Sequence, residues 1–86
     1  MKFVQTETFE RDVRKLDGSL KPRLKKAIEK ISQAPFLGKP LKHLQNVFSE
    51  RVLNFRLIYR VKDDELLLVC FKNREGVYAF LKENGF

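Results

Sequence analysis

Apolar residues in the first part of the chain recur mostly at helical spacing. A weakly alternating run from Lys2 to Thr6 predicts a short strand near a sheet edge. Thr8 suits the N-cap of a helix that ends at Asp17-Gly18, and Ser19 suits the cap of a second helix. The apolar positions of these two helices are Phe9, Val13 and Leu16, then Leu20, Leu24, Ile28 and Ile31. We therefore expect a helical hairpin that buries one face.

The hydrophobic pattern changes to period two after a segment that contains two prolines and a glycine, Ala34 to Pro40. Alternating apolar residues then predict a meander of antiparallel strands with short turns between them. The strands are Val47 to Val52, Phe55 to Val61 and Glu65 to Phe71, with turns at Leu53-Asn54 and Asp63-Asp64. On the middle strand, Arg56, Ile58 and Arg60 share one face, and apolar residues share the other.

The last part of the chain has apolar residues at helical spacing, with Val77 and Leu81 four positions apart. This spacing predicts a short C-terminal helix from Arg74 to Lys82. The order of elements is typical of an α+β fold, in which the helical hairpin packs on one face of a curved antiparallel sheet and leaves the other face free. With 86 residues, the chain is long enough for one core, so residues 1–86 are expected to form a single domain.

Composition narrows the classes of protein that fit this fold. The net charge is +7 and the pI is near 9.8, which favours a polyanionic partner, although a basic surface without such a role is an alternative. A single cysteine excludes an internal disulfide. No stretch is apolar enough for a signal peptide or a membrane span, so we expect a soluble cytoplasmic protein.

Several common types of site do not fit this sequence. His43 is the only histidine and Cys70 the only cysteine, too few for a zinc site. Cys70 lies in an apolar strand and is expected to be a small buried residue rather than a nucleophile. The glycines are too scattered for a phosphate-binding loop. The sequence therefore predicts neither a metal nor a cofactor.

Basic residues interrupt the strand face that should be free. Arg51, Arg56 and Lys72 could converge there, with Arg74 and Tyr78 at the rim, four positions apart on the last helix. Guanidinium groups bind phosphate and stabilise the charge of a pentacoordinate transition state, and nearby cations favour a tyrosine phenolate that could act as a base. The alternative is that Tyr78 only anchors the helix. The cluster predicts RNA cleavage by internal attack of a ribose 2′-hydroxyl.

A second group of basic residues suits RNA binding without chemistry. Lys25 and Lys26 lie on the polar face of the second helix, and Arg60 lies on the arginine-bearing face of the middle strand. A charged helix face is usually just solvated, and no aromatic residue is interleaved with these lysines to stack on bases. Both interpretations remain open for these residues.

The same residues resemble the RelE/ParE superfamily of type II toxin–antitoxin systems, most closely its RelE-like branch, along essentially the whole chain. The matching segments are the helix from Leu24 to Pro35 with Gly38 to Leu44 (GKPLKHL), Arg51 to Val61 (RVLNFRLIYRV) and Arg74 to Tyr78 (REGVY). The resemblance implies a ribosome-dependent endoribonuclease that cleaves mRNA without a metal. It also implies catalytic roles for Arg51, Arg56, Lys72, Arg74 and Tyr78.

The resemblance further implies a cognate antitoxin that covers the basic surface, with operator DNA bound only through the antitoxin complex and no membrane partner. The chain departs from the family pattern at three positions. A basic residue is common where this chain has Ser49, a tyrosine where it has Phe55 and a histidine where it has Asn73. Two alternatives remain. One is a ParE-like inhibitor of gyrase, because the superfamily scaffold serves both uses; the other is an inactive scaffold that binds the antitoxin, because a basic residue is missing at Ser49.

Overall fold

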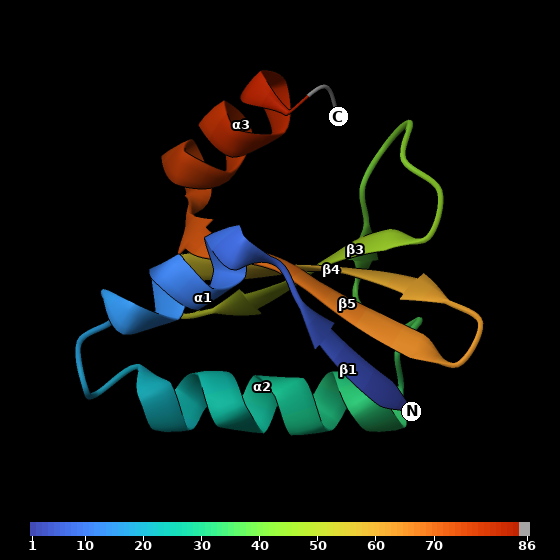
Figure 1. The fold of residues 1–86 in the computed structure, drawn as a ribbon, viewed down its shortest axis with the longest axis horizontal. Helices are drawn as coiled ribbons and strands as arrows, with labels where there is room; N and C mark the ends of the chain where they lie inside the picture. The colour runs from blue at the N-terminus through green and yellow to red at the C-terminus, as the bar shows by residue number, and fades with distance from the viewer. Residues whose placement is uncertain (85–86) are drawn as a thin grey trace.

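The fold is α+β, as the sequence predicts, and it contains the expected helical hairpin, meander and C-terminal helix (Figure 1). A computed structural model describes residues 1–84. Its elements, in chain order, are β1 (Lys2–Gln5), α1 (Glu7–Arg14), α2 (Lys21–Gln33), β2 (Lys39–Pro40), β3 (Val47–Val52), β4 (Phe55–Lys62), β5 (Glu65–Asn73) and α3 (Arg74–Glu83). The short strand β2 was not predicted, because it lies in the segment that prolines and a glycine mark as a loop.

All strands of residues 1–84 lie in one five-stranded sheet with the order β1-β5-β4-β3-β2. The pairs β4–β5 and β3–β4 are antiparallel, as the meander predicts, and β2 adds a further antiparallel pair with β3. β1 lies at the edge as expected, but it pairs in parallel with β5. The sheet is therefore mixed rather than purely antiparallel. The connection through α1 and α2 carries the chain away from β1 to the far edge of the sheet, so β1 and β5 need not form a hairpin.

One face of the sheet packs on the helical hairpin, and we call it the hairpin face. Leu24 and Ile31 of α2 and Phe9 of α1 bury against Leu57 and Tyr59 of β4. Figure 1 shows α2 lying along this side of the sheet. These positions are the apolar stripe of the two helices and the apolar face of the middle strand, so the main core is the one that periodicity predicts.

The opposite face, which we call the arginine face, is not free, and that prediction is wrong. Val77 of α3 packs with Val47, Ile58 and Cys70 in a second buried cluster, and Leu41 packs against it from the loop before β3. In Figure 1, α3 rises from the side of the sheet opposite to α2. β5 needs cover on both faces because it is apolar on both.

The first two helix caps differ from the prediction. Thr6, not Thr8, caps α1, and its hydroxyl accepts a hydrogen bond of 3.0 Å from the Phe9 N–H. α2 follows Leu20 without a side-chain cap, since Pro22 fills its first turn and needs no N–H partner. Ser19 instead donates its N–H to Asp17 in the preceding turn. The helices begin within two residues of the expected caps, so the core is unaffected.

Candidate site for phosphate binding and catalysis

Three of the predicted site residues form a row across the middle of the sheet. In the strand register, Arg51 lies opposite Arg56, and Arg56 lies opposite Lys72. Directly opposite residues of paired strands point to the same face. The row lies on the arginine face, beyond the apolar cluster under α3, because Arg56 is two positions from Ile58 on the same strand.

Lys72 lies on the arginine face, as the sequence predicts, but simple alternation along β5 does not bring it there. Strict alternation along β5 would place Lys72 on the same face as Leu66 and Leu68, which bury in the hairpin-face core. A β-bulge between Ile58 and Tyr59 shifts the register, so the alternation restarts after Val69. The bulge is what brings Lys72 to the same face as Arg56.

Arg74 and Tyr78 lie together on the first turns of α3, which follows β5 without a loop. The Arg74 Nε donates a hydrogen bond of 3.1 Å to the Tyr78 hydroxyl, and its guanidinium carbon lies 5.5 Å from the centre of the Tyr78 ring. Tyr78 is 56% exposed. Its pKa is lowered from the ordinary 10.0, first by the Arg74 hydrogen bond and charge and then by Arg56 and Lys39. The tyrosine is thus accessible and its phenolate is favoured.

A surface hollow joins the arginines. It is lined by Arg51, Arg56 and Arg74, together with Leu53, Asn54 and Phe55 around the β3–β4 turn. Leu53 has a φ of 56°, a left-handed conformation that is unfavourable for leucine, and its backbone oxygen accepts a 2.9 Å hydrogen bond from the Arg51 Nε. The turn therefore contributes a fixed wall, and three guanidinium groups surround a space that suits a phosphate.

Lys72 differs from the arginines because its partner is a carboxylate. Its Nζ lies 2.7 Å from Oδ1 of Asp12, whose side chain is only 7% exposed. The other oxygen of Asp12 accepts the Phe71 N–H at 2.9 Å, since β1 pairs with β5 only as far as Leu68. Asp12 thus completes the edge of the sheet and neutralises Lys72. Sequence reasoning missed Asp12, although a carboxylate three residues after Phe9, on the buried side of α1, was a usable signal.

The departures from the family pattern have structural explanations. Ser49 is buried on the arginine face beside Ile58, so no charge projects from that position. Phe55 stacks on Phe71 with ring centres 5.2 Å apart. The Asn73 side chain caps α3 by accepting the Gly76 N–H at 2.8 Å. Phe55 and Asn73 therefore support the walls of the site.

The residues predicted to bind RNA do not join this row. Lys25 and Lys26 are exposed on α2, which covers the hairpin face, so they point away from the arginines. Arg60 is exposed on the arginine face, but it pairs with Val47 and lies four positions along β4 from Arg56. Their role in RNA binding stays a prediction.

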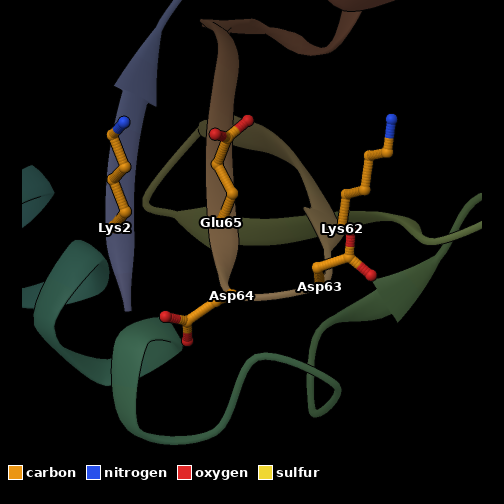
Figure 2. Close-up of a pocket in the computed structure, with 5 residues that line it drawn as sticks. All are labelled: Lys2, Lys62, Asp63, Asp64 and Glu65. Carbon is orange, nitrogen blue, oxygen red and sulfur yellow. The ribbon is translucent and has the colours of Figure 1, made fainter.

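A second hollow lies at the other end of β5, around the β4–β5 turn. Figure 2 shows Lys2, Lys62 and three carboxylates, from Asp63, Asp64 and Glu65, around it. The eight steps from Glu65 to Asn73 along β5 span about 26 Å at the usual rise per residue of a strand, so this hollow is remote from Arg74. Its mixed charges suit neither a phosphate nor a cation, and we assign it no role in the site.

Other reactive groups in residues 1–84 offer no second centre. Burial, reinforced by the charge of Asp12, raises the pKa of the Cys70 thiol to about 12, so the thiol stays protonated as expected of a buried residue. His43 is exposed, and no group of acidic, histidine or cysteine side chains in this part of the chain could hold a metal ion. None of its helices has the length and apolar character needed to cross a membrane.

The fold is similar to that of toxins in solved toxin–antitoxin complexes. The RelB–RelE antitoxin–toxin complex from Methanococcus jannaschii aligns with a TM-score of 0.73 and 24% identity, over 93% of this chain and 98% of that one. The intact E. coli RelBE complex gives 0.77 and 19%, over 84% and 94%. A RelBE toxin–antitoxin complex from Mycobacterium tuberculosis gives 0.64 and 30%, over 85% and 96%.

The sequence comparison agrees with the fold. Residues 3–78 match the family described as the ParE toxin of the type II toxin–antitoxin system parDE, whereas no curated protein matches significantly. The chain is a toxin of a type II toxin–antitoxin system. It belongs to the ParE toxin family within the RelE/ParE superfamily, as the resemblance noted in the sequence implies.

Proposed function

We propose that this toxin is an endoribonuclease that cuts mRNA on the ribosome by internal attack of a ribose 2′-hydroxyl. The observation that carries the proposal is the contact between the Arg74 guanidinium and the Tyr78 hydroxyl at the rim of the arginine-lined hollow. A purely protein-binding surface needs no tyrosine with a lowered pKa beside a cluster of arginines.

The residues have distinct roles in this reaction. The Tyr78 phenolate takes the proton of the 2′-hydroxyl as the 2′ oxygen bonds to phosphorus. The bond from phosphorus to the 5′ oxygen breaks, and the departing oxygen takes a proton from a water molecule. The hydroxide left behind takes the proton from the Tyr78 hydroxyl, so the products are a 2′,3′-cyclic phosphate and a 5′-hydroxyl and the phenolate is restored. Arg51, Arg56 and Arg74 offset the extra negative charge of the pentacoordinate transition state, and this charge stabilisation is the largest contribution.

Lys72 takes a smaller part than the sequence led us to expect. Because Asp12 neutralises it, Lys72 contributes little net charge to the phosphate. We propose that it acts mainly by holding the end of β5 on α1 through this ion pair, so that Arg74 and Tyr78 start from a fixed point. The remaining partners follow from the same proposal: mRNA and the ribosome as targets, and a cognate antitoxin that covers the site.

The test is primer extension on mRNA from a translating extract, with and without purified toxin. New breaks at codon-spaced positions, only when ribosomes are engaged, are expected from the wild type, and Tyr78→Phe should remove them while the protein stays folded. Arg23→Ala, which removes an exposed arginine of α2, is the control and should cut normally. Full cleavage by Tyr78→Phe would reject the assignment of the base.

A second candidate function is inhibition of DNA gyrase by binding alone, because the matching family is that of ParE toxins. It predicts that the purified toxin blocks supercoiling of plasmid DNA and leaves mRNA intact. Under that function Tyr78→Phe would still arrest growth, since no proton transfer is involved. The same variant therefore separates the two functions.

A further inference from the structure

The short strand β2 places a lysine beside the arginine row. Lys39 lies opposite Ser49 in the β2–β3 register, and Ser49 is two positions before Arg51 on β3. Lys39 therefore shares the arginine face and stands diagonally across from Arg51, within reach of a long side chain. Ser49 supplies no charge, and its buried Oγ has no hydrogen-bond partner among residues 1–84. Lys39 of β2 can therefore supply the positive charge that position 49 of β3 does not.

The backbone at position 39 is held firmly although β2 has only two residues. Gly38 packs so closely on the Tyr59 hydroxyl that a Cβ at position 38 would collide with it. Pro40 pairs with Phe48, and the Leu41 N–H donates to the Val47 carbonyl at 2.9 Å. Lys39 itself is exposed, so its ammonium is free to meet a ligand from a fixed starting point.

The charge of Lys39 also reaches the catalytic tyrosine. After Arg74 and Arg56, it is the remaining cation that lowers the Tyr78 pKa. Cations therefore face Tyr78 from α3, β4 and β2. The strand register independently places Lys39 on the arginine face, because Lys39 lies opposite Ser49.

We propose that Lys39 is a further phosphate-binding residue of the site. It takes the place of the basic residue that is common in the family at position 49, where this chain has serine. The assignment rests on the proposed endoribonuclease function. The ammonium is a compact charge with three donors, suited to a non-bridging phosphate oxygen beside Arg51. It also stabilises the Tyr78 phenolate before the substrate arrives.

The experiment compares Lys39→Ala with Lys42→Ala, which removes an exposed lysine of the following loop. Cleavage by Lys39→Ala should fall about tenfold, as expected for the loss of one charge-assisted hydrogen bond, and Lys39→Arg should restore most of it. In parallel, the tyrosine absorbance change is followed against pH. The chain has two tyrosines, and burial raises the pKa of Tyr59, so the lower transition reports Tyr78. This transition should move to higher pH in Lys39→Ala and stay in place in Lys42→Ala.

The two readouts separate the possible failures. Wild-type cleavage by Lys39→Ala would overturn the phosphate role, whatever the titration shows. If the wild type cuts no RNA, the endoribonuclease proposal fails, and the tyrosine titration alone then tests whether Lys39 belongs to the site. An unshifted Tyr78 transition in Lys39→Ala would then overturn the placement of Lys39, whereas a raised one would keep Lys39 in an anion site with a different ligand.

Discussion

The two faces of the sheet use neighbouring residues of the same strand for different purposes. On the hairpin face, Leu57 is fully buried against the helices. On the arginine face, the preceding residue, Arg56, lines a hollow together with two other arginines. The positive charges gathered in this hollow repel one another and so destabilise the folded state. Burial of the apolar residues on the hairpin face offsets this repulsion. The hairpin face thus carries the main core, whereas the arginine face carries a smaller buried cluster under α3 and, beyond it, the candidate site.

The sharpest test of this division replaces the two neighbours on β4 separately. Leu57→Ala should lower the free energy of unfolding by about 3 kcal/mol, because it leaves a cavity in the core. Arg56→Ala should lower cleavage about 100-fold, as for loss of a contact to transition-state charge, with little change in stability. Urea unfolding and primer extension measure the two effects. Equal effects of both variants on unfolding would break the division.

Asp12 links the two faces, and removing it should cost stability. Asp12→Ala leaves the Phe71 N–H and the Lys72 ammonium without their partner, so we expect a loss of about 2 kcal/mol in unfolding free energy. The matched control is Glu50→Ala, which breaks the ion pair with Lys30, a residue whose side chain is 62% exposed; that change should cost less than about 1 kcal/mol. A loss no larger than that of the control would show that Asp12 is dispensable.

The pH dependence of cleavage tests the electrostatics of the arginine face. Because cations lower the Tyr78 pKa, the phenolate forms at lower pH than in a free tyrosine, and the rate should rise with pH until it levels off above that pKa. Arg74→Ala removes the largest cause of the shift, so the rise should move to higher pH. A pH–rate profile of both proteins measures this. An unchanged profile in Arg74→Ala would mean that another group supplies the base.

The smallest effect concerns the strained turn between β3 and β4. Leu53→Asn should stabilise the protein by about 1 kcal/mol, because asparagine adopts left-handed backbone angles more readily than leucine. Leu37→Asn, at another exposed loop leucine without a left-handed conformation, should change stability little. Thermal unfolding compares the two variants. If Leu53→Asn also reduces cleavage, the strain contributes to the shape of the hollow.

The hairpin face could be predicted from sequence because a single rule, apolar periodicity, determines it. Leu24, Ile31 and Leu57 fall at regular spacings that identify both the elements and their buried sides. The arginine face could not be predicted in full, since α3 covers part of it and no short-range pattern shows where a C-terminal helix will pack. The bulge was equally hidden, because the run from Leu66 to Phe71 is apolar at every position.

Some of the site depends on pairings between residues far apart in sequence. Arg51, Arg56, Arg74 and Tyr78 were identified from their types and their likeness to a family pattern, although no spacing in the chain shows that Asp12 meets Lys72 across 60 positions. Lys39 was overlooked because a proline-containing segment predicts a loop rather than an edge strand. The residue types of the site were thus easier to predict from sequence than the contacts that each charged side chain makes.

The bulge between Ile58 and Tyr59 gives β5 two independent lengths of alternation. Before the bulge, Leu66 and Leu68 point into the hairpin-face core; after it, Phe71 does so while Lys72 points to the arginine face, and the strand leads directly into α3. The bulge therefore lets the end of one strand serve the core through Phe71 and the site side through Lys72, while the burial pattern of its earlier half is unchanged, so a shared scaffold can carry different functional surfaces at this end.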